Sequence, residues 1–107
     1  MITYDDFKKI ELRVAKIVEA VFHPNADKLY VLKIEVAGET KQIIAGIRAS
    51  YPSPEALIGR KVVVVNNLEP AMIRGAESNG MLLAATSDDG PVILIPDSDV
   101  PSGALVK

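Results

Sequence analysis

The chain has 107 residues, no cysteine and a formal net charge of −2. This length predicts one domain, because a chain of this size can bury enough surface for a single core. The absence of cysteine excludes a disulfide framework and a thiolate metal site, and it fits a reducing compartment. The small negative charge argues against indiscriminate binding of nucleic acid, which depends on a large cationic surface.

The distribution of charge leaves room for a local basic face. Residues 1–78 carry 11 lysines and arginines against 10 acidic residues, whereas residues 79–107 carry one lysine against four aspartates. Any cationic surface is therefore expected in the first part of the chain.

The N-terminal residues are acidic where a signal peptide is basic. The longest apolar run, Val62–Val65, is far shorter than the ~20 residues that a membrane span needs. The sequence therefore predicts a soluble, cytoplasmic protein that does not contact a membrane.

Signals for short elements follow one another along the first half of the chain. A capping residue with an acid three positions later predicts a helix at the N-terminus. The next run has apolar positions at helical spacing but is rich in β-branched residues, which favours a strand. Apolar–polar alternation then predicts a half-buried strand, and Gly38 permits a tight turn into its partner. The expected elements are a helix over 4–9, a strand over 12–22 and a hairpin over 29–45.

The second half predicts a short helix inserted between strands. Ser53, Pro54 and Gly59 supply a capping residue, the first helical position and a terminating glycine. The next two expected strands are nearly all apolar, so we expect them to be buried on both faces. The expected elements are a helix over 53–59, strands over 61–66, 81–85 and 92–95, a turn over 87–90, and a loop bounded by Pro96 and Pro101.

This succession of six short strands with little helix predicts an all-β fold, either a small barrel or a sandwich. A five-stranded barrel with a helix between its third and fourth strands is the arrangement of the OB-fold.

Residues 23–28, His-Pro-Asn-Ala-Asp-Lys, contain the only histidine of the chain. A catalytic His23 needs partners, but the sequence offers no cysteine, no second histidine and no obvious base, and a metal site lacks ligands. Proline and the Asn-x-Asp pattern set turns through φ restriction and side-chain hydrogen bonds. We therefore interpret this segment as a turn.

Residues 75–80, Gly-Ala-Glu-Ser-Asn-Gly, are similar to the nucleophile elbow of hydrolases. However, Ala76 stands where that motif has glycine, and no catalytic triad is available. The glycines predict a sharply folded loop that exposes Ser78 and Asn79. The sequence has no glycine-rich phosphate motif, and its carboxylates are scattered. It therefore predicts a protein that is not an enzyme and needs no cofactor or metal.

Polar residues concentrate in the loops that flank the expected barrel strands, and a solvated surface without a ligand is one explanation. OB barrels, however, bind oligonucleotides through one strand face and adjoining loops. With three tyrosines, two phenylalanines and no tryptophan, generic stacking on single strands is poorly supported, and recognition of a folded RNA suits the composition better. The available cations are Lys28, Lys33, Lys41, Arg48 and Arg74.

Three stretches of the chain resemble the tRNA-binding domain family. They are LRVAKIVEA, HPNADKLYVLKIEV and VVVVNNLEPAMIRGAESNGMLLAA. The family includes free-standing dimeric tRNA-binding proteins, the C-terminal appendage of many methionyl-tRNA synthetases, and the endothelial monocyte-activating polypeptide. The resemblance covers residues 5–107 and implies an OB-fold barrel that binds tRNA by structure rather than sequence, near its outer corner.

The resemblance also implies which side chains contact tRNA. Basic side chains would contact phosphates, amides and a hydroxyl would hydrogen-bond the backbone or an exposed base, and a methionine would give apolar contact. For three of these residues a structural explanation stays open: a strand cap for the second asparagine, a solvated charge for the last arginine, and a core position for the methionine. Ala71 and Met72 stand where relatives often have a basic residue. The implied residues are Asn25, Lys28, Lys33, Arg48, Asn67, Arg74, Ser78 and Met81.

A homodimer is a further implication of the resemblance. We expect residues 1–86 to form the barrel with its N-terminal helix, and 87–107 to form an extension of short strands that dimerises. An unbroken apolar run in so small a protein needs cover, although it could pack on its own barrel. The implied interface residues are Val92, Ile93, Leu94, Ile95 and Leu105. The expected partners are tRNA, a second copy and an aminoacyl-tRNA synthetase; the alternative function is a dimerisation or chaperone-like protein-interaction module.

Overall fold

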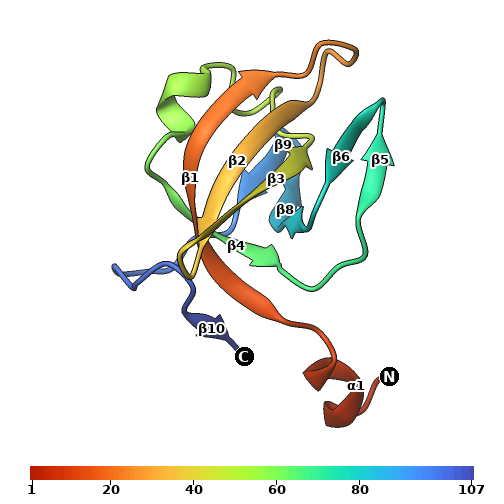
Figure 1. The fold of residues 1–107 in the computed structure, drawn as a ribbon, viewed down its shortest axis with the longest axis vertical. Coiled ribbons are helices and arrows are strands. Elements are labelled where there is room, and N and C mark those ends of the chain that lie inside the picture. Colours follow the sequence, from red (N-terminus) through yellow and green to blue (C-terminus); the bar gives the residue numbers. More distant parts are fainter.

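The computed structural model describes residues 1–107. Most of its elements are short antiparallel strands, and the main sheet that they form is curled (Figure 1). Neither helix has the length and apolar character needed to cross a membrane. The elements in chain order are α1 (Tyr4–Lys8), β1 (Leu12–Phe22), β2 (Tyr30–Val36), β3 (Glu39–Ala45), the 3₁₀ helix η1 (Pro54–Leu57), β4 (Lys61–Val65), β5 (Ala71–Ile73), β6 (Ala76–Ser78), β7 (Met81–Leu82), β8 (Ala84–Ser87), β9 (Gly90–Ile93) and β10 (Leu105–Val106).

The main sheet has the strand order β3-β2-β1-β4-β7, with β10 paired to β1. The long strand β1 pairs with β4 through its first half and with β2 through its second half. Its register with β2 shifts between Ile17 and Glu19, and a bulge of this kind bends a strand and increases its twist. Because of this bend, β1 can belong to both halves of the curled sheet.

Hydrogen bonds bring the outer edge of β3 to the segment between β6 and β7. Asn79 N donates to Gln42 O at 2.8 Å, and Ile44 N donates to Ser78 Oγ at 2.9 Å. The two ends of the sheet therefore approach each other, and the sheet curls into a half-barrel. The all-β, OB-like fold predicted from the sequence is confirmed.

The core fills the inside of this curled sheet. Side chains of β2 alternate as predicted, with Tyr30, Leu32, Ile34 and Val36 buried. The three central valines of β4 are also buried, as expected for a nearly all-apolar strand. The buried Tyr30 keeps its hydroxyl paired by donating to Tyr51 O at 2.7 Å.

The N-terminal helix and the hairpin turn form as their local signals predict. Thr3 caps α1 in a capping box with Asp6. The turn between β2 and β3 consists of Ala37 at φ +52° and Gly38 at φ +85°. Two positive φ values suit the right-handed twist of a hairpin.

The helix predicted over 53–59 is only a 3₁₀ turn, and the serine cap expected at its N-terminus is absent. Pro54 begins η1 as predicted, but the Ser53 side chain makes no hydrogen bond to the helix backbone. Ser53 Oγ instead donates to the Glu55 carboxylate at 2.9 Å. A capping serine accepts a backbone N–H through its oxygen, whereas here the hydroxyl donates, so this bond satisfies no N–H group at the start of η1.

The predicted buried strand over 81–85 is also wrong. The chain forms two strands there, β7 and β8, and leaves Met81, Ala84 and Ala85 exposed. Strand β8 leaves the main sheet to pair with β9, and all four of its residues are exposed. The sequence also did not reveal β5, β6 and β10, and β9 ends at Ile93 rather than Ile95.

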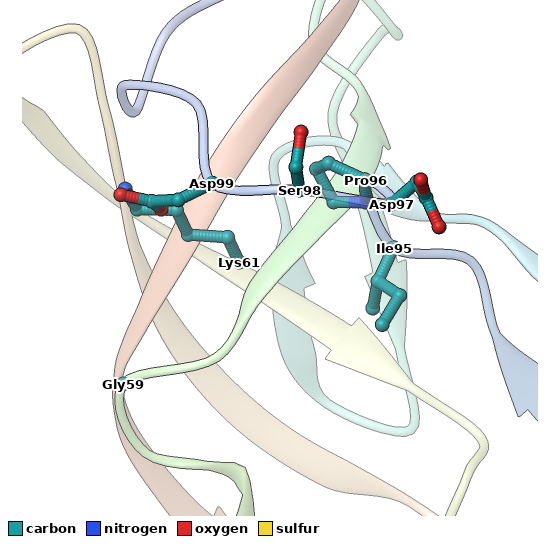
Figure 2. Close-up of a pocket in the computed structure, with 7 residues that line it drawn as sticks. All are labelled: Gly59, Lys61, Ile95, Pro96, Asp97, Ser98 and Asp99. Carbon is teal, nitrogen blue, oxygen red and sulfur yellow. The ribbon is translucent and has the colours of Figure 1, made fainter.

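The C-terminal segment is fastened to the barrel by polar contacts. The Glu35 carboxylate accepts from Gly38 N at 3.1 Å and from Ser102 Oγ at 2.8 Å, and these donors hold the pKa of Glu35 below its ordinary value. Lys61 Nζ lies 2.7 Å from Asp99 and lowers the pKa of that carboxyl in the same way. Figure 2 shows this pair on one side of a shallow pocket.

Candidate nucleic-acid interface

His23 anchors the loop between β1 and β2, and its side chain is buried. Its Nδ1 accepts from Asn25 N at 3.0 Å, and its Nε2 lies 3.1 Å from Ile73 O. A backbone N–H can only donate, so Nδ1 carries no proton and Nε2–H donates to the carbonyl of Ile73. Both ring nitrogens are therefore occupied by the backbone, and the predicted turn is confirmed.

Two arginines bind the same loop from other parts of the chain. Arg48, which follows β3, donates from Nη1 to Ala26 O at 3.4 Å, and Arg74 donates from Nη2 to Asn25 O at 3.1 Å. Arg74 lies in the turn of the β5–β6 hairpin at φ +54°, next to Gly75 at φ +89°. The hairpin therefore stands against the β1–β2 loop, as the upper right of Figure 1 shows.

These contacts bring four of the predicted residues to one end of the barrel. The side chains of Asn25, Lys28 and Arg74 are exposed, and Arg48 is partly exposed. Three positive charges and an amide thus surround one loop. Exposed cations with a hydrogen-bonding amide are suited to phosphates and to the polar edges of an RNA backbone.

Lys33 lies on the outer face of β2, between Glu19 of β1 and Gln42 of β3. Gln42 Nε2 donates to Glu77 O at 2.9 Å, which places β6 beside this part of the sheet. The outer face of β2 and β3 is thus flanked by the β1–β2 loop and the β5–β6 hairpin. OB-folds bind oligonucleotides and oligosaccharides on this face, between the corresponding loops.

Ser78 does not have the exposed position predicted for it. Its side chain is buried, and its Oγ accepts from Ile44 N at 2.9 Å and donates to Gly80 O at 3.0 Å. The hydroxyl therefore ties β6 to β3 and closes the sheet. Its hydrogen-bonding capacity serves the backbone, and the predicted exposure is wrong for this physical reason.

Ser78→Ala is expected to lower the free energy of unfolding by about 1–3 kcal/mol, because it leaves a buried N–H and a buried carbonyl without this partner. Urea unfolding of the variant and the wild type measures the difference. Ser87→Ala, which removes an exposed hydroxyl bonded to Gly90 O, is the matched control and should change stability little. Equal stability of Ser78→Ala and wild type would contradict the structural role.

Asn67 lies at the other end of the molecule, beside the end of α1. Its Oδ1 accepts from Glu11 N at 2.8 Å, and its Nδ2 donates to Lys9 O at 2.8 Å. Its amide therefore holds the junction between α1 and β1, in line with the structural alternative. Met81 pairs with Val65 on β7 and is 45% exposed, so it is not a core residue.

Sequence reasoning missed Phe22, the last residue of β1. Its side chain is 49% exposed, and the guanidinium of Arg48 lies 4.1 Å from its ring centroid. The only available signal was its position directly before the turn at His23. Neighbouring residues in that strand are equally apolar, so the pattern does not single it out.

The apolar run near the C-terminus divides between core and surface. Ile93 is 6% exposed and belongs to the core of its own barrel, so the prediction that it lies at an interface does not fit its position. The other four predicted interface residues are exposed. They are Val92, Leu94, Ile95 and Leu105. Ile95 and Leu105 line an apolar groove of about 430 Å³ together with Val14, Val63, Pro96, Val100, Ala104, Val106 and Lys107.

The structure contains no group of three or more histidine, cysteine or acidic side chains placed to hold a metal ion. In Figure 2, Asp97 and Asp99 point to opposite sides of the pocket that Lys61 and Gly59 also line. The two carboxylates therefore do not converge on one point.

Nearly the whole chain is similar to part of the methionine–tRNA ligases. Methionine–tRNA ligase of Pyrococcus furiosus is 49% identical over 106 residues, covering 99% of this chain and 14% of the ligase. The corresponding ligase of Deinococcus radiodurans is 48% identical over 108 residues, covering 100% of this chain and 16% of the ligase. The chain thus spans about one seventh of the length of these relatives.

Solved structures cover the whole fold. A MetRS related protein from Pyrococcus horikoshii superposes with a TM-score of 0.91 at 33% identity, covering 100% of this chain and 98% of that one. The CsaA chaperone protein from Picrophilus torridus has a TM-score of 0.86 at 32% identity, with both chains covered completely. The family described as "Putative tRNA binding domain" matches residues 12–105. The chain belongs to this family of tRNA-binding domains.

Proposed function

We propose that this chain is a non-catalytic module that binds tRNA by recognising the shape of the folded RNA backbone. The observation that carries the proposal is the pair of arginines that hold the β1–β2 loop, Arg48 on Ala26 O and Arg74 on Asn25 O. These bonds support a binding role for the loop, which also contains the exposed Lys28. Membership of the tRNA-binding domain family supports tRNA as the ligand.

Recognition of shape suits this surface better than recognition of sequence. The net charge is −2, so binding depends on a few well-placed cations rather than on a broad basic surface. Cations and an amide held on a rigid loop can match the spacing of phosphates in a folded RNA, and such contacts carry no base sequence. An unstructured RNA presents no fixed spacing and gains less from this preorganisation.

The test compares folded tRNA with an unstructured RNA of equal length in a gel shift at low salt. We expect binding of the folded tRNA and much weaker binding of the unstructured RNA. Arg74→Glu and Lys28→Glu should each weaken binding about tenfold and reduce the salt slope by about one phosphate contact. Equal binding of both RNAs would refute shape recognition.

Lys8→Glu is the matched control for these charge reversals. Lys8 is exposed on α1, at the opposite end of β1 from the β1–β2 loop, and its replacement changes the net charge by the same amount. We expect it to leave tRNA affinity within about twofold of wild type once salt screens distant charges. If Lys8→Glu weakens binding as much as Arg74→Glu, the effect comes from overall charge and the proposed site is wrong.

We infer that the chain acts as an auxiliary tRNA-binding module for an aminoacyl-tRNA synthetase. The similarity to part of the methionine–tRNA ligases supports this partner. A module that holds tRNA without reading its sequence raises the local concentration of tRNA, and the catalytic protein supplies the discrimination. The same module can act within a longer chain or in trans.

A homodimer is the second part of the proposal. The apolar groove lined by Ile95 and Leu105 supports it, as do the exposed Val92 and Leu94, because exposed apolar surface is costly to leave in water. A two-fold dimer would use the same patch on both copies and present two equivalent tRNA faces.

The same apolar surface supports a second candidate function, the binding of unfolded peptides. The similarity to CsaA chaperone proteins favours it. Titration with an unfolded peptide and with folded tRNA, each in competition with the other, separates the two functions. Binding of the peptide but not of tRNA would favour the chaperone-like function.

A further inference from the structure

Phe22 presents an aromatic ring at the surface but is held in place by the core. Its ring stacks on that of Tyr30, with centroids 5.5 Å apart and planes 15° from parallel. Tyr30 is completely buried, and its hydroxyl is bonded to Tyr51 O. Phe22 itself remains 49% exposed. A half-exposed ring is therefore braced in one orientation by a buried one.

The distances show that Arg48 and Tyr30 lie on the same face of the Phe22 ring. The Arg48 Cζ is 4.1 Å from the centroid of Phe22 and 5.8 Å from that of Tyr30. Two groups stacked on opposite faces of a ring would be about 7 Å or more apart, which is twice the contact distance of ~3.5 Å. The observed separation is smaller, so both groups share one face, and we assign the 49% exposure of Phe22 to its other face.

The open face lies beside the cations of the proposed interface. Arg48 contacts both the Phe22 ring and the carbonyl of Ala26, and the exposed Lys28 follows in the same loop. A flat apolar surface next to positive charge is the arrangement on which nucleobases stack while their phosphates contact cations. The charge of Arg48 lies behind the ring and leaves the stacking surface unobstructed.

We propose that the open face of Phe22 is a stacking site for one unpaired nucleobase of the bound RNA. This inference rests on the proposed binding of tRNA and adds a base contact to it. Stacking tolerates any base because every base has a π-face, so the contact is consistent with recognition by shape. It favours an RNA that presents an unpaired base next to a structured backbone, and it needs little ordering on binding because Tyr30 and Arg48 already fix the ring.

The absence of tryptophan from the chain makes a direct test feasible. Phe22→Trp keeps a flat ring at the site and introduces the only tryptophan of the protein. We expect its fluorescence to be quenched as bulk folded tRNA is added, along the same titration curve that a gel shift gives. Tyr4→Trp is the control, because Tyr4 is 70% exposed on α1 and should report no base contact.

A second pair of variants measures the contribution of the ring to affinity. Phe22→Leu keeps apolar volume but removes the flat face, and it should weaken tRNA binding about tenfold. Phe22→Tyr should bind within about twofold of wild type. Circular dichroism melting verifies that each protein is folded at the temperature of the assay.

The outcomes separate this inference from the proposed function. If wild type shifts tRNA but the tryptophan of Phe22→Trp is not quenched and Phe22→Leu binds normally, the stacking site is refuted and tRNA binding stands. If wild type does not shift tRNA, the proposed function itself fails and the stacking site fails with it. Quenching together with weaker binding of Phe22→Leu supports the inference.

Discussion

Gly80→Ala is expected to lower the free energy of unfolding by about 3 kcal/mol, or roughly 10–20 °C in Tm, through two separate costs. Gly80 has φ +137°, a conformation that residues with a side chain rarely adopt. A Cβ at this position would also lie 2.9 Å from Val65 O, a backbone atom that cannot move without disturbing β4. Thermal and urea unfolding measure the loss.

Gly38→Ala is the matched control for this variant. Gly38 also has a positive φ, +85°, but no atom lies within 4 Å of where its Cβ would be. It therefore carries the backbone cost alone, about 1 kcal/mol. The difference between the two variants measures the steric cost of closing the sheet at Gly80. Equal stability losses would show that the close approach to β4 is unimportant.

Ile93→Asp is expected to unfold the protein and Ile95→Asp to dissociate the proposed dimer, although the two residues are only two positions apart. Ile93 is 6% exposed and part of the core, whereas Ile95 is 60% exposed. A carboxylate at 93 would be desolvated in an apolar interior, a cost of several kcal/mol against a total stability of about 5–15 kcal/mol. We therefore expect Ile93→Asp to unfold the protein, as measured by circular dichroism.

Ile95→Asp should stay folded and shift the protein from dimer to monomer. Ile95 is exposed beside the apolar groove, so a charge there is solvated in the monomer but buried in the proposed interface. Sedimentation velocity over a range of concentrations measures the change. Val21→Asp, at the opposite end of β1 from its pairing with β10, has a similar exposure of 45% and should remain dimeric. A monomeric wild type, or a dimeric Ile95→Asp, would contradict the interface.

Local signals were sufficient for most of the long elements. The capping box at Thr3, the alternation of β2 and the glycine of the first hairpin each depend on residues within a few positions of one another. Such short-range preferences are visible in a sequence because no distant partner decides them. The strands β5, β6, β7 and β10 are only two or three residues long, too short for any period to be detected.

Contacts between distant segments decided whether a polar side chain of the candidate site bonds the protein's own backbone. Ser78 and Asn67 have the residue types that bind RNA, but the first bonds Ile44 N and the second bonds Glu11 N and Lys9 O. No local pattern shows whether a hydroxyl or amide is used by the protein's own backbone. In contrast, Arg48 and Arg74 lie together at the loop that contains Asn25 and Lys28, because the two arginines bond the carbonyls of Ala26 and Asn25.

The sequence by itself determined the class of fold, the turn at 23–28 and the stretches that indicate the family, because these depend on local preferences and on residue identity. Outside the regular strands β2 and β4, whose burial follows their apolar pattern, only the tertiary structure decided which side chains reach the surface. Ile93 and Ile95 are the same residue type, yet one is covered by its own barrel and the other is not. Burial is a property of the elements that pack over a position, and those elements are brought there by the fold.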